Sequence, residues 1–434
     1  MKLIEYLRNN VNQCPDKIIA VCGDEKISYS QLYEKASLLS KNYTSREVVV
    51  FKASQTIDFL ITYFAIHIAN AIAVPLECDI PERSLNKILE SLNETSIPDD
   101  VADILYTTGT TGKSKGVMIS HKAIIATAMN LIEGQSFSRD LCFIISGPLN
   151  HIGSLSKVFP TIIQGGTLII ISGLKGFDAF FKALEYPCDK MATFMVPSGL
   201  RMLIRFGAKR LKEFVDKIEF IETGAAPMAQ TDMEDLRKLL PKTRLYNTYA
   251  STETGVVSTY DYSSNDCVAG CLGKSLCNSN IIITEEGNVA CSGNTLMSGY
   301  VGEEELTKSV MRNGIIYTSD KGYIDDKGML RLLGRDGDVI NVGGYKVSPI
   351  EIENIVLSMN EIDDCICIPF HHSILGTIVK LLYVKAKDTS ITKTEIAKYI
   401  ASMVERYKVP QSFEEVEVIK RTYNGKLDRK AYLK

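Results

Sequence analysis

The sequence predicts an α/β fold in two parts: a large N-terminal domain of stacked sheets and helices over residues 1–336, and a small α+β C-terminal domain over residues 337–434. A chain of 434 residues is too long to build one hydrophobic core, so two or three domains are expected. Beyond Arg335 the sequence changes to Asp and Gly turns followed by helix and strand patterns, and this change places the boundary.

The most apolar stretch of the N-terminal part is residues 59–76. His67, Asn70 and Pro75 interrupt it, so we expect a buried helix that leads into a short strand over residues 71–76 rather than a membrane span.

The C-terminal part begins with a helix pattern over residues 350–359, directly after Pro349. A second helix is expected from residue 393 to about residue 406. Three strands are expected over residues 365–369, 378–384 and 415–419.

Residues 105–117 are the most informative segment, because they combine four Thr, three Gly and two Lys in a turn between two apolar runs that predict short strands. Glycine lets backbone N–H groups approach phosphate oxygens, Thr hydroxyls donate hydrogen bonds, and lysine supplies positive charge. The segment therefore predicts a polyphosphate loop, with a plain polar hairpin as the alternative. The candidate phosphate ligands are Thr107, Thr108, Gly109, Thr110, Thr111, Gly112 and Lys115.

A Walker A loop is the main competitor, and its spacing does not fit. That motif needs a glycine five positions before Gly-Lys-Ser/Thr, where this chain has Thr107. A helix would also have to begin at Ser114, where apolar and β-branched residues follow instead. We therefore expect a loop between strands.

The loop resembles the phosphate loop of the adenylate-forming superfamily, which comprises acyl-CoA synthetases, peptide-synthetase adenylation domains and luciferase-like enzymes, with Ser114 in place of a usual proline. Other segments resemble further motifs of that superfamily in the same order, and acid–CoA ligases are the most similar branch. The N-terminal part is shorter than usual, which implies a trimmed subdomain. The matching segments are residues 223–228, 246–255, 317–322, 334–353 and 424–430.

The resemblance implies a site for ATP and Mg²⁺. Gly224, Ala225 and Ala226 would lie along the adenine. The remaining nucleotide ligands would be Tyr249 stacked on adenine, Thr252 at a phosphate, Glu253 on Mg²⁺, Asp320 on the ribose hydroxyls, and Arg335.

Taken singly, these residues have simpler interpretations. Asp320 before Lys-Gly suits a turn, Glu253 suits the first turn of a helix, and Lys426 could be a solvated surface cation. Their joint order favours the functional interpretation.

The implied reaction is attack by a carboxylate on the α-phosphate of ATP, with pyrophosphate as leaving group. Lys426 would bridge the two reacting anions. The acyl group would then pass to the thiol of coenzyme A along Gly343, Gly344 and Tyr345. Two alternatives are loading of the phosphopantetheine of a separate carrier protein and, more distantly, a P-loop NTPase or nucleotide-binding switch.

The acid itself stays open. In amino-acid-activating members of the superfamily, an aspartate in the corresponding segment pairs with the α-ammonium group of the substrate, whereas residues 147–155 contain no carboxylate. The resemblance therefore disfavours an α-amino acid, and a small carboxylic acid is expected. The segment 148–151 resembles a motif of acyl- and aryl-CoA synthetases in which the histidine gates the carboxylate pocket, so His151 is the candidate. The alternative is a histidine that begins a helix in the core.

Composition agrees with a soluble intracellular enzyme, and a cytoplasmic location is expected. A net charge of −3 and a pI near 6.1 argue against nucleic acid as the main partner. The 11 cysteines lack zinc-site spacing and suggest reduced thiols, and we expect neither a secretion signal nor an integral membrane segment. No metal other than magnesium is implied.

The resemblance also implies a hinge at Gly337, about which the C-terminal domain would swing as a lid between two poses. Glycine tolerates widely different φ angles, which suits a hinge. An ordinary Asp-Gly turn is the alternative.

Overall fold

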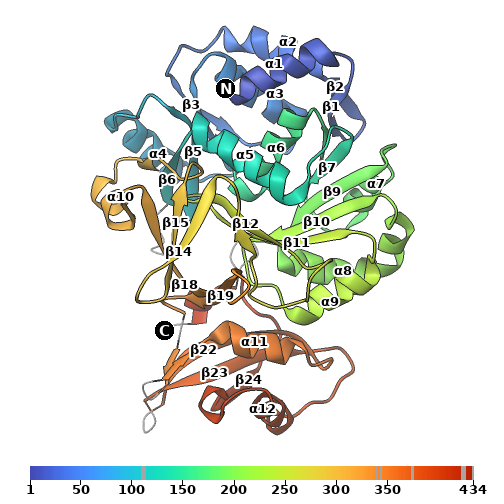
Figure 1. Cartoon of the computed structure of the whole chain (residues 1–434), viewed down its shortest axis with the longest axis vertical. Helices are drawn as coiled ribbons and strands as arrows, with labels where there is room; N and C mark the ends of the chain where they lie inside the picture. The colour runs from blue at the N-terminus through green and yellow to red at the C-terminus, as the bar shows by residue number, and fades with distance from the viewer. Residues whose placement is uncertain (109–113, 339, 343–344, 373–375, 422–426, 433–434) are drawn as a thin grey trace.

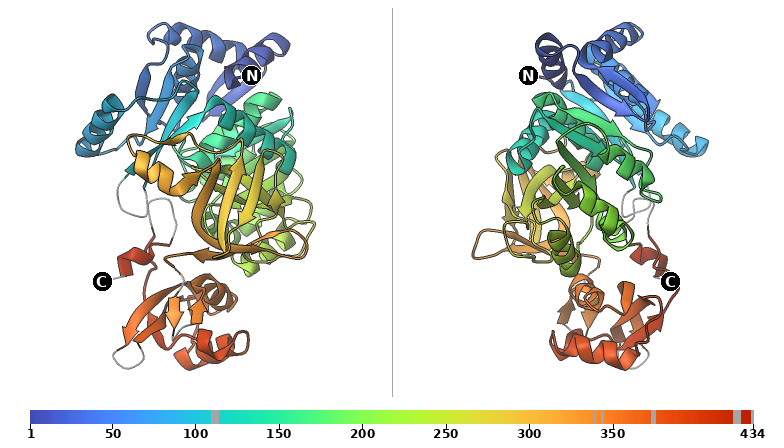
Figure 2. Two further views of the ribbon diagram at one scale, coloured as in Figure 1. Left: turned by 60° about the vertical axis from the view of Figure 1, so that its left-hand side comes forward. Right: turned by 90° about the vertical axis from the view of Figure 1, so that its right-hand side faces the viewer.

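The computed structural model describes residues 1–108, 114–338, 340–342, 345–372, 376–421 and 427–432 (Figure 1). It confirms the predicted α/β class. A large body contains the N-terminal elements, and the smaller group of C-terminal elements lies at one end of it in every view (Figures 1 and 2). Each part has its own apolar core.

A nine-stranded sheet in the order β13-β12-β11-β10-β9-β7-β8-β1-β2 forms the centre of the large body. The six strands from β1 to β11 in that order run parallel, so their carboxyl ends lie on one edge of the sheet. The strands are β1 (Ile18–Cys22), β2 (Glu25–Ser28), β7 (Leu141–Ile145), β8 (Thr167–Ile170), β9 (Lys190–Met195), β10 (Ile218–Gly224), β11 (Arg244–Ser251), β12 (Gly255–Asp261) and β13 (Lys274–Ser275).

Helices cover both faces of this sheet. Phe143 and Phe220 face a core shared with α1, α2, α3, α5 and α6, whereas Ile144 and Ile221 face a second core shared with α7, α8 and α9. Burial on both faces explains the continuous apolar runs of these strands. The bounds are α1 (Leu3–Gln13), α2 (Tyr29–Ser40), α3 (Ile57–Ile68), α5 (His121–Gln135), α6 (Ile152–Gln164), α7 (Asp178–Leu184), α8 (Pro197–Leu211), the short helix η1 (Lys212–Phe214) and α9 (Gln230–Leu239).

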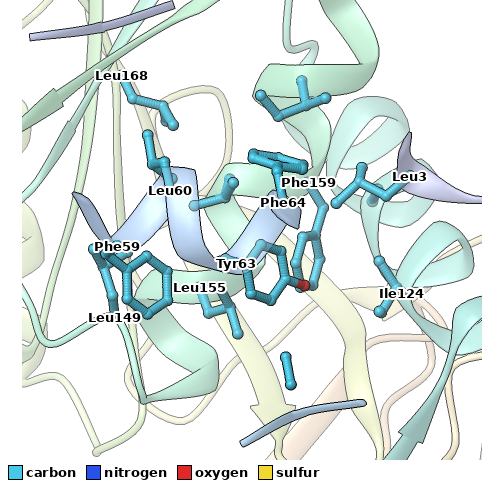
Figure 3. Close-up of a cluster of buried hydrophobic side chains, with 14 of the residues drawn as sticks. Leu3, Phe59, Leu60, Tyr63, Phe64, Ile124, Leu149, Leu155, Phe159 and Leu168 are labelled. Carbon is cyan, nitrogen blue, oxygen red and sulfur yellow. The ribbon is translucent and has the colours of Figure 1, made fainter. Parts of the chain in front are cut away.

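Helix α3 lies in the middle of the first core. Its side chains Phe59, Leu60 and Phe64 lie among residues of α6 such as Leu155 and Phe159 (Figure 3). The expectation of a buried helix followed by a strand is therefore confirmed, since α3 leads into β4 (Ile72–Leu76). Within the described part of the chain, no helix is both long and apolar enough to cross a bilayer.

A second sheet, in the order β16-β6-β5-β4-β3, carries the predicted phosphate loop. Its hairpin pairs Thr107 with Lys115, which confirms the two strands expected around the turn. A strand begins at Ser114 where a Walker A loop requires a helix, so that alternative is wrong. The elements are β3 (Val48–Lys52), β4, α4 (Glu82–Glu94), β5 (Val101–Thr108), β6 (Ser114–Ser120), β16 (Gly299–Tyr300) and the neighbouring α10 (Glu304–Val310).

A third sheet has the strand order β14-β15-β18-β17, and β19 also pairs with β18. Asp320 on β18 pairs in register with Arg335 at the end of β19. The strands are β14 (Ser279–Ile283), β15 (Asn288–Gly293), β17 (Met311–Arg312), β18 (Ile315–Ile324) and β19 (Leu330–Arg335).

The C-terminal elements differ from expectation mainly in their bounds. The second helix ends at Ala401 and not near residue 406, because the chain turns at Ser402. The last strand covers residues 412–415 and not 415–419, because pairing with β23 begins at Ser412, while Ile419 is buried outside any strand. The elements are β20 (Ile340–Val342), β21 (Tyr345–Val347), α11 (Pro349–Leu357), β22 (Ile362–His372), β23 (Gly376–Lys385), α12 (Lys393–Ala401), η2 (Arg406–Lys408), β24 (Ser412–Glu415) and η3 (Arg429–Tyr432).

Helix α8 connects the two parts through ion pairs. Arg205 pairs with Asp363 of β22, and Arg201, which also binds Asp232 of α9, lies 3.7 Å from Asp364.

Candidate active site

The hairpin of the phosphate loop lies beside a tyrosine that sequence reasoning missed. Lys115 on β6 places its Nζ 5.4 Å from the centre of the Tyr300 ring. Tyr300 reaches this position because β16 pairs with β6, in a register that joins Tyr300 to Val117. The candidates Gly109, Thr110, Thr111 and Gly112 lie outside the described residues, as does the side chain of Thr108.

Glu253 contacts the same tyrosine at its hydroxyl. The Tyr300 hydroxyl donates a hydrogen bond of 3.0 Å to Glu253 Oε1, and burial together with this carboxylate raises the pKa of Tyr300. Lys115 and Glu253, from motifs far apart in the sequence, are therefore brought to one aromatic ring. The sequence around Tyr300 offered one feature that could have identified it as a site residue, namely its position after Gly299 in an extended segment.

Thr252 and Glu253 stand in the tight turn between β11 and β12, not in a helix. Ser251 and Thr254 hold this turn through two hydrogen bonds of 3.2 and 3.0 Å between backbone N–H groups and side-chain oxygens. Gly255 follows with φ +63°, and a Cβ there would lie 2.8 Å from a backbone oxygen. Only glycine fits, so the local sequence determines where the carboxylate is presented.

Tyr249, Asp320 and Arg335 form a second cluster. The Tyr249 hydroxyl donates to Asp320 Oδ2 at 2.7 Å, and Arg335 Nε donates to Asp320 Oδ1 at 3.1 Å. Burial, followed by the Asp320 charge, raises the pKa of Tyr249. Asp320 lies within strand β18 and not in a turn, so three residues from separate motifs meet at one carboxylate.

Gly224 ends β10, and Ala225 and Ala226 begin the turn that follows it. A Cβ on Gly224 would lie 2.8 Å from the backbone oxygen of Thr248, next to Tyr249. Ala225 is exposed and adopts φ +67°, a strained conformation for a residue with a side chain. Strained backbone conformations cluster at active sites, ligand-binding segments and switch regions.

His151 is the N-cap of α6, so it begins a helix as the alternative interpretation held, but its side chain is partly exposed and does not lie in the core. Its Nε2 lies 3.9 Å from Glu77 Oε1, and both side chains are partly exposed, at 24% and 36%. Glu77 was not predicted, because it follows β4 and meets His151 only in the folded chain.

The residues expected at the acceptor side are less completely described. Tyr345 is 58% exposed and stacks on Tyr407 with ring centres 4.5 Å apart. Gly343, Gly344 and Lys426 lie outside the described residues. Gly337 lies in a turn in which the Asp338 N–H donates to the Arg335 carbonyl at 2.9 Å, so the Asp-Gly turn is present.

The described candidates thus gather where parallel strands end, which is where open α/β sheets bind ligands. Tyr249 and Gly224 lie on the neighbouring strands β11 and β10, and the turn with Glu253 follows β11 directly.

Comparison with known proteins adds independent evidence. A family model described as AMP-binding enzyme matches residues 7–94 and 91–301, and one described as AMP-binding enzyme C-terminal domain matches residues 351–426. The chain is 26% identical over 378 residues to 4-coumarate-CoA ligase 1 of Narcissus pseudonarcissus, covering 81% of this chain and 69% of the relative. It is 25% identical over 442 residues to 4-coumarate--CoA ligase 2 of Nicotiana tabacum, covering 93% and 80%. Across four such ligases the chain spans 63% to 80% of the relative's length.

Solved structures share the fold. ATP-bound MatB from Rhodopseudomonas palustris matches with a TM-score of 0.88 at 22% identity, covering 100% of this chain and 98% of that one. The o-succinylbenzoate CoA synthetase MenE of Bacillus subtilis, in complex with the acyl-adenylate OSB-AMP, matches with a TM-score of 0.84 at 20% identity, covering 98% and 97%.

Proposed function

Because this chain belongs to the family of AMP-binding enzymes, we propose that it joins a carboxylic acid to the thiol of coenzyme A in two steps driven by ATP. The convergence of Lys115 and Glu253 on Tyr300 carries this proposal, since a cation and a metal-binding carboxylate at one place suit a polyphosphate. In the first step a carboxylate oxygen attacks the α-phosphorus and the bond to pyrophosphate breaks. In the second the thiol sulfur attacks the acyl carbon, AMP leaves and the thiol proton passes to water.

The residues present fit a magnesium ion. Mg²⁺ in nucleotide sites is held by one or two carboxylates plus substrate phosphates, and a carboxylate retains free lone pairs when it accepts one hydrogen bond. Glu253 accepts from Tyr300 through Oε1 and is partly exposed, so it would hold the ion. The ion supplies positive charge that neutralises the departing pyrophosphate.

We assign the nucleotide contacts as follows. Tyr249 and the turn at Gly224, Ala225 and Ala226 would flank the adenine, and the Asp320 carboxylate would accept hydrogen bonds from the ribose. Its present partner Arg335 ties this carboxylate to the end of β19. Thr252 and the phosphate loop, including Lys115 and Thr107, would bind phosphate oxygens. Their donors would act where charge develops in the transition state.

We further propose that residues 337–434 are a mobile lid and that residues 1–336 are the adenylating domain. The lid would bring Lys426 to the carboxylate and α-phosphate in the first step, and Gly343, Gly344 and Tyr345 to the acceptor in the second. Coenzyme A is the proposed acceptor because the relatives reported above are named for it. No observation favours a carrier protein.

His151 would border the carboxylate of the acid, with Glu77 as its partner. The acid would be small, and the enzyme would work in the cytoplasm. An exchange assay between ATP and labelled pyrophosphate over a library of carboxylic acids tests the first step. Adding coenzyme A to an active acid tests the second. Formation of ADP in place of AMP would refute the proposal.

A further inference from the structure

One aromatic ring stands between the two segments that the proposed function assigns to the acid and to the nucleotide. Phe194 is the next-to-last residue of β9 and is partly exposed, although its strand neighbours Thr193 and Met195 are buried. A Cβ placed on Gly153, two residues after His151, would lie 3.2 Å from Phe194 Cε1. A Cβ on Gly224 would lie 3.7 Å from Cε2 of the same ring.

Strand register explains how the ring reaches this position. Phe194 pairs directly with Glu222 of β10, so both side chains project from the same face of the parallel sheet. Gly224 follows Glu222 by two residues and faces the same way, but it has no side chain. The missing side chain lets the Thr248 backbone oxygen and the Phe194 ring approach the end of β10, since a Cβ there would lie 2.8 Å from that oxygen and 3.7 Å from Cε2 of the ring.

A buried ion pair lies next to the Phe194 ring. Lys157 of α6 places its Nζ 2.7 Å from Glu222 Oε1, and the two side chains are 2% and 1% exposed. The same ammonium lies 5.1 Å from the centre of the Phe194 ring. Burial lowers the pKa of Lys157 while Glu222 opposes that shift.

This pair is well suited to hold the ring still. A cation at this distance attracts the face of an aromatic ring, and the attraction is stronger where water is excluded. Glu222 fixes the ammonium in turn through the ion pair, so the cation that contacts the ring is itself held in place.

We propose that Phe194 forms the closed end of the acyl site and restricts the enzyme to short carboxylic acids, with Lys157 and Glu222 as positioning residues for the ring. The inference rests on the proposed function, because it assumes that the acid lies between His151 and the turn at Gly224. An acid with a longer acyl chain would have to displace the Phe194 ring from Lys157 and from its position beside Gly153.

The test is a chain-length profile of pyrophosphate exchange, from acetate to decanoate, with benzoate added for width. Wild type should give its highest kcat/KM with short acids. Phe194→Ala should raise the ratio of kcat/KM for octanoate to that for butyrate by about tenfold or more, since removing a ring opens room for several methylene groups. Phe194→Leu should give a smaller shift in the same direction.

Two further variants separate this role from a general loss of stability. Met195→Ala removes a buried side chain from the opposite face of β9 and should leave the length profile unchanged. Lys157→Met combined with Glu222→Gln removes both charges without leaving one unpaired. It should raise KM for short acids and flatten the length profile, while KM for ATP stays the same.

The outcomes are distinct. Exchange by wild type together with an unchanged length profile in both Phe194 variants would overturn this inference alone. Absence of exchange with every acid in wild type would refute the proposed function and the inference with it.

Discussion

Arg205 of α8 and Asp363 of β22 form an ion pair that joins the large body to the C-terminal part. Both side chains are partly exposed, at 36% and 38%. Such pairs contribute modestly, about 0.2–1 kcal/mol, and are weakened by salt. The Arg205–Asp363 pair therefore makes a weak contribution to the contact between the two parts, beside the Arg201–Asp364 pair of the same helix.

Arg205→Ala should loosen this contact. A loss of up to about 1 kcal/mol corresponds to a roughly fivefold change in population, so tryptic cleavage between the two parts should accelerate by up to that factor at low salt. Arg210→Ala is the matched control, because Arg210 lies on the same helix and pairs with Asp178 inside the large body. Equal cleavage rates in wild type and Arg205→Ala would show that the pair does not hold the lid.

Lys426→Ala should slow acyl-adenylate formation by about 10²-fold or more, because its charge would act mainly on the transition state. The affinity for ATP should be nearly unchanged. Single-turnover kinetics and ATP titration measure the two quantities, with Lys430→Ala as the control. Near-normal exchange in Lys426→Ala would transfer the role to another residue.

Glu253→Gln keeps the shape of the side chain but removes a charge proposed to hold Mg²⁺. Activity should fall, and the magnesium concentration that gives half-maximal activity should become much higher. Tyr300→Phe removes only the hydrogen bond to Glu253, so its effect should be about tenfold or less. A magnesium dependence in Glu253→Gln identical to that of wild type would contradict the metal assignment.

Gly337→Pro should uncouple the two half-reactions. Gly337 lies in the turn between Arg335 and Asp338, and proline would fix φ near about −65° and restrict the preceding residue. We expect pyrophosphate exchange to persist, while thioester formation from preformed acyl-adenylate collapses. If both half-reactions keep similar rates, the hinge lies elsewhere, with Asp336 and Asp338 as the next candidates.

His121 makes stability depend on pH. Burial, with smaller effects of His67, Lys2 and Arg46, lowers the pKa of His121 to about 3. An unfolded histidine titrates near about 6.5, so the unfolded chain binds the additional proton as the pH falls below that value. The stability from neutral His121 is thus complete above about pH 6.5 and is lost progressively toward pH 3, by at most about 1.4 kcal/mol per pH unit.

Urea unfolding at pH 7.5 and pH 5.5 measures this effect, and His121→Asn should reduce the loss between the two pH values. An identical loss in the variant would assign the pH dependence to other groups.

Local patterns predicted much of the architecture. The hairpin around the phosphate loop, helix α3 with β4, and helix α11 were all expected, because each depends on periodicity and turn residues within a short window. Element ends were less accurate. The last strand began three residues before the expected position because its bounds depend on pairing with β23, a contact that no local window contains.

The site divides in the same way. The sequence by itself determined the candidate ligands Tyr249, Glu253 and Asp320, because each belongs to a compact motif. Only the tertiary structure decided that Tyr300 joins Lys115 to Glu253, that Glu77 meets His151, and that Phe194 lies over a buried Lys157–Glu222 pair. These residues carry no motif of their own. They meet through strand register and helix packing between distant segments, and such contacts form only when the whole chain folds.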